Sequence, residues 1–168
     1  NQPTKVTLFV SVNYIELVKE TRNDLYLDVL MYFEQLWNDP RLKFYNRQLN
    51  TIIGGEDIKR LIWVPDTFIS NAFNVRAHNV PSPQMFVKIN SSGDVWLTVS
   101  IKCSQELSSF PCDKQRCHMR FESYAHNANT IIHNLTAIHE NGPNVIPNFK
   151  IRDYAVENKI TQFESGKV

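Results

Sequence analysis

Histidines and cysteines are the side chains best suited to metal binding or nucleophilic chemistry, and the sequence contains five of the first and three of the second. The histidines show no metal-binding spacing, such as two histidines separated by a glutamate and two further residues. Cys112 and Cys117, with His118 beside them, are the best cluster of candidate zinc ligands, but the sequence offers no second pair to complete a four-ligand site. We therefore expect no metal site.

Motifs for other chemistries are equally lacking. The sequence has no G-x-S-x-G nucleophile elbow, no phosphate-binding P-loop and no G-x-G-x-x-G dinucleotide fingerprint. Its 18 basic and 17 acidic side chains are interspersed and give a formal net charge of +1, so no basic block is available to neutralise nucleic-acid phosphates. We expect a protein that is not an enzyme, uses no cofactor and has no nucleic-acid partner.

The strongest local pattern lies between Cys103 and Cys117, which enclose 13 residues. Within it, the run Phe110–Asp113 (FPCD) leads toward the second cysteine, and its Phe-Pro pair supplies an apolar anchor and a fixed turn. A disulfide that closed a loop of this length would restrict the unfolded chain by about 3 kcal/mol. With three cysteines, any single disulfide leaves one thiol unpaired.

Two N-glycosylation sequons begin at Asn90 (Asn-Ser-Ser) and Asn134 (Asn-Leu-Thr). Together with cysteines suited to a disulfide, they favour a secreted or extracellular setting, because both modifications belong to the secretory route. Asn90 and Asn134 are therefore candidate glycosylation sites.

Alternation of apolar and polar residues dominates the chain. Val6, Leu8, Val10 and Val12 share one face of an N-terminal strand, and the stretch 25–33 repeats the pattern at greater length. Further strands are predicted at 58–64, 84–89, 94–103, 117–124, 130–138 and 148–156, and a short helix near 56–61. Many short strands separated by turn residues predict an all-β fold, an antiparallel sandwich or barrel.

We interpret residues 1–168 as one domain. No internal repeat, low-complexity tract or linker interrupts it, and apolar residues make up 42% of the composition, enough for a packed core. No apolar run approaches the roughly 20 residues that a membrane-spanning helix needs.

The cysteine segment closely resembles the signature loop of the Cys-loop receptors, the pentameric ligand-gated ion channels, in its spacing and its internal Phe-Pro-x-Asp. The resemblance extends along essentially the whole chain. It includes four further motifs: Trp37–Leu42 (WNDPRL), Ile62–Phe68 (IWVPDTF), Phe121–Tyr124 (FESY) and Phe163–Gly166 (FESG). The last three look like the segments that carry the first, second and third binding loops of the family.

The resemblance implies an immunoglobulin-like antiparallel β-sandwich, the extracellular ligand-binding domain of such a receptor. It also implies a Cys103–Cys117 disulfide, with Cys112 left as a buried free thiol where the family usually has a bulky apolar residue. Relative to the family pattern, the chain begins at the first strand and stops inside the third binding loop. We therefore expect the family's N-terminal helix and last strand to be absent from residues 1–168.

In the family the ligand lies between neighbouring subunits of a ring, so the resemblance implies a homo- or hetero-pentamer. It assigns six residues to the site: Phe68, Glu122, Tyr124 and Phe163 on the principal side, and Tyr32 and Glu34 on the complementary side. The residues themselves support part of this assignment. Tyr32 and Glu34 are two positions apart, so they share one face of a strand, opposite the apolar residues that should face the core.

Glu34 leads to a prediction about the ligand. Glycine- and GABA-type subunits carry an arginine two residues after the complementary aromatic residue, where it binds the carboxylate of the ligand. At about 5 Å and an effective dielectric constant near 20, two like charges instead repel by about 3 kcal/mol. Because aromatic rings attract cations, we predict that the site prefers a compact amine or quaternary ammonium to a simple amino acid.

The resemblance implies a domain that binds a small neurotransmitter-like ligand and couples it to pore gating. Such a domain lies on the extracellular face of the plasma membrane, joined to a transmembrane domain outside this chain. The alternative is a secreted binding protein of the same fold that has no channel. Four apolar spans of about 20 residues after Val168 would decide for the channel.

Overall fold

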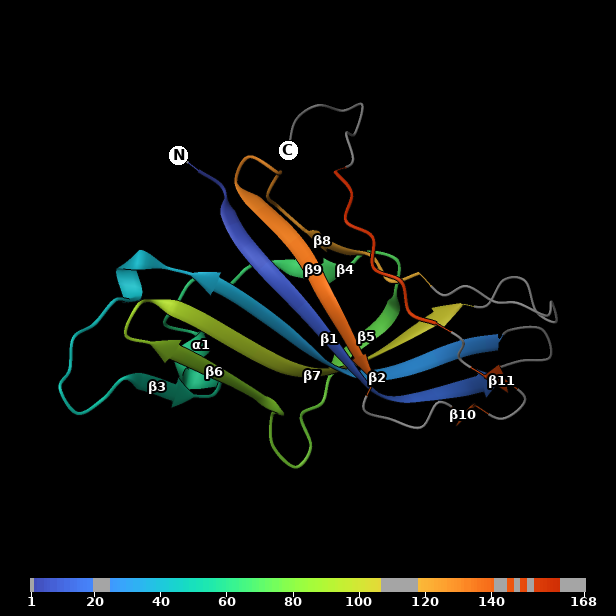
Figure 1. Cartoon of the computed structure of the whole chain (residues 1–168). Coiled ribbons are helices and arrows are strands. Elements are labelled where there is room, and N and C mark those ends of the chain that lie inside the picture. The colour runs from blue at the N-terminus through green and yellow to red at the C-terminus, as the bar shows by residue number, and fades with distance from the viewer. Residues whose placement is uncertain are drawn as a thin grey trace.

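The structure is a computed structural model that describes residues 2–19, 25–106, 118–140, 145–146, 149–150 and 153–160. Its main element is a seven-stranded sheet (Figure 1) with the strand order β3-β6-β7-β2-β1-β9, in which β5 also pairs with β7. The strands of this sheet are β1 (Thr4–Lys19), β2 (Leu25–Asn38), β3 (Thr51–Gly54), β5 (Phe73–Ala77), β6 (Met85–Asn90), β7 (Asp94–Glu106) and β9 (Ile131–Glu140).

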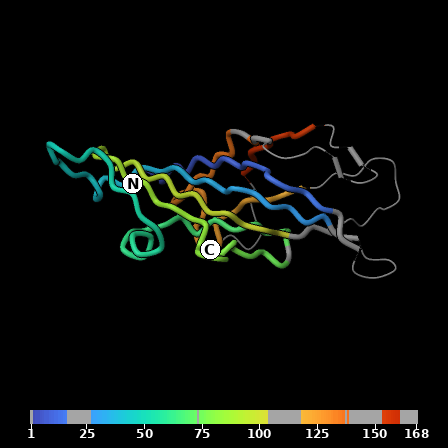
Figure 2. Tube along the Cα trace, turned by 90° about the horizontal axis from the view of Figure 1, so that it is seen from below, coloured from blue at the N-terminus to red at the C-terminus, as the bar shows by residue number. Residues whose placement is uncertain are grey.

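Three long strands form the centre of the sheet. β2 pairs antiparallel with β1 on one side and with β7 on the other along almost its whole length. Figure 2 shows these strands running along an elongated body. β9 joins the other side of β1 in parallel, starting from the pair Thr4 and Ile131. The all-β class is confirmed, and the parallel β1–β9 pair is the departure from the antiparallel order that the pattern predicted.

A second layer covers part of this sheet. It contains β4 (Thr67–Ile69) paired antiparallel with β8 (Phe121–Ser123). The rings of Phe121 and of Phe33 on β2 stack with centroids 5.2 Å apart and planes at 9°, which joins the two layers. The remaining elements are the 3₁₀ helix η1 (Pro40–Leu42), the helix α1 (Glu56–Lys59), and the strand pair β10 (Val145–Ile146) and β11 (Phe149–Lys150).

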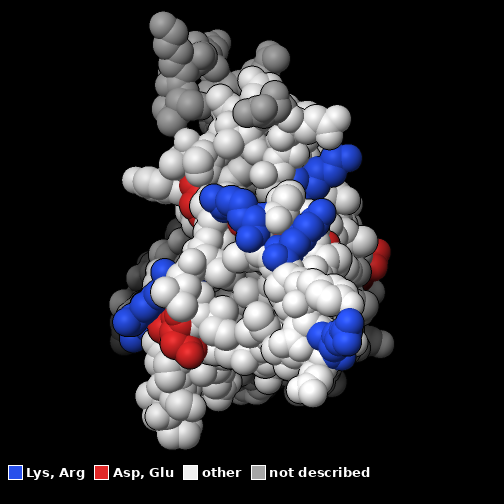
Figure 3. All heavy atoms as spheres, turned by 90° about the vertical axis from the view of Figure 1, so that its left-hand side faces the viewer, with Lys and Arg blue, Asp and Glu red and all other residues white. Residues whose placement is uncertain are grey.

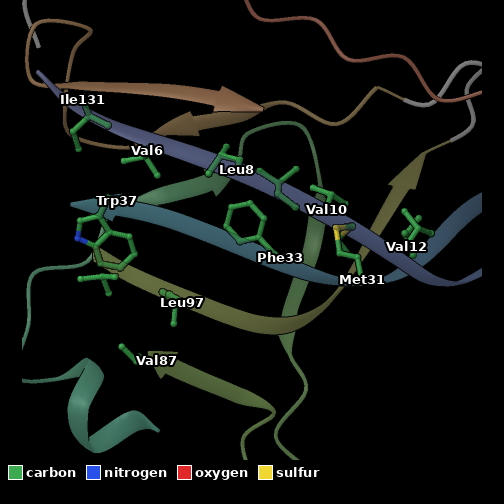
Figure 4. Close-up of a cluster of buried hydrophobic side chains, with 14 of the residues drawn as sticks. Val6, Leu8, Val10, Val12, Met31, Phe33, Trp37, Val87, Leu97 and Ile131 are labelled. Carbon is green, nitrogen blue, oxygen red and sulfur yellow. The ribbon is translucent and has the colours of Figure 1, made fainter. Parts of the chain in front are cut away.

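The core is built from the alternate residues that the sequence pattern identified. Val6, Leu8, Val10 and Val12 of β1 are all buried, with 0–7% of their surface exposed. They point toward buried side chains of the neighbouring strands, including Met31 (Figure 4). Burying each such side chain contributes about 1.5–3 kcal/mol. A register shift of one residue would turn this face outward, so the core also fixes the register.

The strand predicted at 58–64 is wrong. Residues 56–59 form α1, which is followed by turns, as the alternative prediction of a short helix near 56–61 had it. The Ile58 side chain packs against the core instead of lying in a strand. Within the described residues, no helix is long and apolar enough to cross a membrane.

Candidate ligand-binding site

Two of the predicted principal-side residues, Phe68 and Tyr124, contact each other on the small β4–β8 sheet. Their ring centroids are 5.7 Å apart and the ring planes meet at 78°, an edge-to-face contact. Phe68 is 38% exposed and Tyr124 is 79% exposed, so both rings present aromatic surface to solvent. Glu122 lies opposite Phe68 in the β4–β8 register. The fourth predicted residue, Phe163, lies outside the described residues.

The turn that carries Tyr124 is held by Asp66, the residue that precedes β4. The Ser123 hydroxyl donates to Asp66 Oδ1 at 2.5 Å, and the backbone N–H of Ala125 donates to Asp66 Oδ2 at 2.6 Å. The backbone N–H of Tyr124 also donates to the Asp66 carbonyl oxygen at 3.3 Å. Because the two carboxylate bonds reach the residues on either side of Tyr124, Asp66 fixes the backbone from which the ring projects. This function of Asp66 is not apparent from the sequence motif, because it depends on contacts with residues almost 60 positions away.

Asp66 is held in its ionised form. Burial is the largest single influence and raises the pKa of the carboxyl, but the hydrogen bonds from Ser123 and Ala125 and the charge of His126 together outweigh it. The pKa of Asp66 therefore lies below its ordinary value. Hydrogen bonds to an ionised acceptor are stronger than those to a neutral one, so the charge strengthens the bonds that hold the turn.

Tyr32 and Glu34 lie on β2, on the face of the large sheet that points away from the core. Their neighbours Met31 and Phe33 are 0% and 7% exposed, whereas Tyr32 is 41% exposed. The predicted sharing of one outward face therefore agrees with the structure. The two sides of the candidate site do not meet within one chain, because the core and the β4–β8 layer lie on the opposite face of this sheet.

Glu34 contacts an aromatic cluster that the sequence motifs do not predict. The Trp96 indole N–H donates to Glu34 Oε2 at 2.9 Å. The Phe86 ring centroid lies 6.0 Å from that of Trp96, and Lys88 Nζ lies 5.8 Å from the Trp96 ring centroid, a cation–π distance. The complementary side thus carries a carboxylate and an ammonium that both contact the same indole.

Thr98 lies beside Glu34 in the β2–β7 register, and its buried hydroxyl has no hydrogen-bond partner among the described residues. A signal for these residues was present in the sequence. Trp96 and Thr98 alternate with the apolar residues Val95 and Leu97, and this is the rule that placed Tyr32 and Glu34 on the outward face. An open hollow of about 380 Å³ lies beside the cluster and is lined by Lys5, Thr7, Leu36, Asn38, Lys88 and Trp96, among others.

The Trp37–Leu42 motif has a structural function at one end of the sheet. The Arg41 guanidinium donates to both carboxylate oxygens of Asp39 at 2.9 and 2.7 Å, and the Arg41 backbone N–H donates to Oδ1 at 3.1 Å, which caps η1. The Asp39 backbone N–H in turn donates to the carbonyl oxygen of Gly93, which has a φ of 83°.

Figure 3 views the left-hand side of Figure 1 and shows basic side chains spaced over that surface with fewer acidic ones between them.

The predicted disulfide stays a prediction. Cys103 on β7 is buried and has no disulfide partner among the described residues, and burial raises the pKa of its thiol to about 11. Cys112 and Cys117 both lie outside the described residues. Among the residues that the structure does describe, no group of three His, Cys, Asp or Glu side chains is placed to hold a metal ion.

The two sequon asparagines have different surroundings. Asn90 Oδ1 accepts hydrogen bonds from the Ser92 hydroxyl at 2.6 Å and from the Asp94 backbone N–H at 2.9 Å, and Asn90 Nδ2 donates to Asp94 Oδ2 at 3.1 Å. Asn134 is exposed on β9. Glycosylation of either residue stays a prediction.

Comparison with known proteins identifies the family. Residues 1–166 match the family described as the neurotransmitter-gated ion-channel ligand binding domain. The chain is 27% identical to the gamma-aminobutyric acid receptor subunit beta of Lymnaea stagnalis, over 98% of this chain and 36% of that protein. It is 33% identical to ligand-gated ion channel 50 of Caenorhabditis elegans, over 75% of this chain and 26% of that protein. It is also 33% identical to the gamma-aminobutyric acid receptor subunit gamma-1 of Rattus norvegicus, over 77% of this chain and 28% of that protein.

The chain therefore belongs to the neurotransmitter-gated ion-channel ligand-binding domain family, as its cysteine segment and binding-loop motifs indicated. This is a family of receptor domains and not of enzymes. The matched part spans between about a quarter and just over a third of the length of these three relatives.

Proposed function

We propose that this chain binds a small neurotransmitter-like ligand at the interface between neighbouring subunits of a pentamer. The ligand would lie between the Phe68–Tyr124 pair of one subunit and the Tyr32–Glu34 face of the next. The observation that carries this proposal is the solvent-facing contact of Phe68 with Tyr124, centroids 5.7 Å apart, on a turn fixed by Asp66. In the whole protein, binding would favour one quaternary arrangement over another and so gate a pore.

The arrangement of the two sides supports an interfacial site. Each side exposes aromatic surface, yet the two sides lie on opposite faces of one chain, so one copy alone forms no closed pocket. A repeated contact between two different surfaces generates a ring when it closes. The number five comes from the family. The family also supports a location on the extracellular face of the plasma membrane, with the secreted binding protein as the alternative.

We also propose that the ligand carries an ammonium group and lacks a carboxylate. Phe68 and Tyr124 offer two π surfaces to a cation, each worth up to about 1–2 kcal/mol when water is excluded. Glu34 puts a negative charge on the complementary side, where it repels a carboxylate. A second candidate is an amino-acid ligand, which is favoured by the ammonium of Lys88 above Trp96 and by the names of the gamma-aminobutyric acid receptor relatives.

One titration tests the site and the charge preference together. Choline, GABA and glycine are titrated against the assembled wild-type protein and against Tyr124→Ala and Glu34→Arg. We expect choline to bind most tightly, Tyr124→Ala to weaken it at least tenfold, and Glu34→Arg to shift the preference toward GABA by about a hundredfold. Asp57→Arg on α1 makes the same charge change away from the site and serves as the control.

Two results would contradict the proposal. A stable monomer that binds a probe with full affinity excludes an interfacial site. Tighter binding of GABA than of choline by the wild type, with no response to Glu34→Arg, refutes the amine preference and leaves the amino-acid candidate.

A further inference from the structure

A partly buried series of polar side chains connects the two layers at the residue next to Phe68. Thr67 Oγ1 on β4 lies 2.7 Å from Gln35 Oε1 on β2 and 2.8 Å from His133 Nε2 on β9. Gln35 is 5% exposed and His133 is half-buried. The hydroxyl of one β4 residue is therefore bonded to two different strands of the large sheet.

The number of hydrogens fixes the direction of these bonds. A threonine hydroxyl carries a single hydrogen, and it donates to the Gln35 oxygen. The Thr67 oxygen must then accept from His133, so the imidazole is protonated on Nε2 and, when neutral, bare on Nδ1. The bonds form one series: His133 donates to Thr67, and Thr67 donates to Gln35.

Thr67 is the residue immediately before Phe68. In a strand, adjacent side chains point to opposite faces, so Thr67 is held against the large sheet while Phe68 turns outward. Among the described residues, β4 is three residues long and pairs only with β8. Its backbone bonds are therefore few, and β4 is held to the large sheet by the buried side chain of Ile69 and by the bonds of Thr67 to Gln35 and His133.

We propose that His133 is a positioning residue for the Phe68–Tyr124 side of the site, and that acid loosens this side. The added proton goes to Nδ1, so Nε2–H still donates to Thr67, and the loosening comes from placing a charged ring at a half-buried position. This inference concerns the site of the proposed function and rests on that function for its importance to ligand binding. The bond series itself is independent of any ligand.

The charges around His133 decide the direction of the pH effect. Burial lowers the pKa of His133, and the carboxylate of Asp66 opposes this to a smaller degree. Lys5 on β1 and Glu34 on β2 lie on the other face of the sheet, and Glu122 on β8 lies opposite Phe68, on the outward side. The neutral ring is thus favoured in the folded chain.

The sign of the effect follows from linkage. The unfolded or released ring binds a proton near its ordinary pKa of about 6.5, and the folded ring binds it only at lower pH. The contribution of His133 is complete above about pH 6.5 and is lost as the pH falls through the folded pKa. Each unit by which the pKa is lowered corresponds to about tenfold in the equilibrium for release at low pH.

Hydrogen exchange without ligand tests the proposal. Protection factors of the β4 and β8 amides, corrected for the intrinsic pH dependence of exchange, are compared at pH 7.5 and pH 5.0. We expect the wild type to lose protection several-fold at pH 5.0 in these two strands, while the amides of β2 and β7 keep theirs. The ring signals of His133 should titrate over the same pH range as the loss.

Three variants separate positioning from simple packing. His133→Gln retains an N–H donor for Thr67 but cannot titrate, so its protection should be near the wild-type value at pH 7.5 and unchanged at pH 5.0. Thr67→Val removes the bond but leaves the ring in place, so it should lower protection at both pH values and keep the response to acid. His126→Gln is the matched control, because His126 also lies near Asp66 but is exposed and should leave the wild-type response intact.

Acid-induced loss of protection that persists in His133→Gln would overturn the proposal, and so would a wild type that shows no loss. If His133→Gln fails to fold, the titration of the wild-type ring against the β4 amides still decides the question. The result is also distinct from that of the ligand titration. Failure to bind choline, GABA or glycine would refute the proposed function and leave these exchange data unaffected.

Discussion

The two sides of the candidate site rest on supports of very different extent. Phe68 and Tyr124 project from β4 and from the turn after β8. These two strands have three residues each and are held by the buried Ile69, by the Phe121–Phe33 stack and by a few side-chain bonds of Asp66 and Thr67. Tyr32 and Glu34 project from β2, a strand of 14 residues that is paired on both sides. One side is positioned by a few packing and polar contacts, and the other by the register of the whole sheet.

This difference predicts how each side responds to change. A side chain placed by sheet register keeps its position as long as the core keeps its register, because the backbone bonds are numerous and shared among strands. A side chain placed by a few polar contacts moves when one of those contacts is lost. The Phe68–Tyr124 side should therefore be the adjustable part of the site, and the Tyr32–Glu34 side the fixed part. Three substitutions test the comparison, in order of decreasing effect.

The largest effect is expected from Met31→Ala, which removes a core side chain beneath the Tyr32–Glu34 side. Met31 is 0% exposed on the core face of β2 and is adjacent to Tyr32. Replacing such a side chain by alanine leaves a cavity and typically costs about 2–5 kcal/mol of unfolding free energy. We expect both sides to be destabilised together, because the core carries both layers.

Urea unfolding followed by circular dichroism measures this loss. Leu61→Ala is the control, since Leu61 is 84% exposed and its truncation should change the unfolding free energy by less than about 0.5 kcal/mol. Equal stability of the two variants would mean that the β2 face does not depend on the core.

An intermediate and local effect is expected from Asp66→Ala. The substitution removes the acceptor for Ser123 and Ala125, and we expect it to cost about 1–2 kcal/mol, mostly confined to the turn around Tyr124. Because the pKa of Asp66 is lowered in the folded chain, its contribution is present above about pH 4 and lost as the pH falls through the folded pKa.

Hydrogen exchange and acid unfolding check both parts of this prediction. Asp66→Ala should reduce protection of the Ala125 amide strongly while β2 amides change little, and it should flatten the stability profile below pH 4. Asp66→Asn, which keeps one oxygen acceptor, should fall between the alanine variant and the wild type. A uniform loss across both sides would mean that Asp66 supports the whole domain and not one turn.

The sequence predicted the elements with a strong period better than those fixed by long-range contacts. The alternation of Val6 to Val12 and of residues 25–33 placed the long strands and the outward face of Tyr32 and Glu34, because a buried face requires a strict period of two. The strand expected at 58–64 failed because this apolar run is too short to distinguish a strand from a helical turn that packs on the core. The parallel pairing of β1 with β9 depends on residues far apart in the chain, so no local pattern reveals it.

Recognition of the family motifs explains most of what was predicted about the site. Phe68, Glu122 and Tyr124 were identified from two short motifs, and the structure brings these motifs together on β4 and β8. Trp96, Lys88 and the polar series at His133 were missed for a physical reason. Their importance lies in contacts across strands, and the identity of a cross-strand neighbour follows only from the register.

The smallest effect is expected from Trp96→Phe, on the fixed side. The substitution removes the N–H that donates to Glu34 at 2.9 Å but keeps an aromatic ring on the sheet beside Phe86 and Lys88. Both partners are partly exposed, so water can replace the lost donor, and we expect a cost of about 0.5 kcal/mol. Amide chemical shifts should change in the paired strands β2, β6 and β7 only.

Lys88→Met, which removes the cation above the ring but keeps an apolar chain, is the companion variant and should have a similarly small effect. If Trp96→Phe instead lowers the protection of the Tyr124 turn, the two sides are coupled through the sheet. The Glu34–Trp96 contact would then stabilise the turn that carries Tyr124 as well as its own strands.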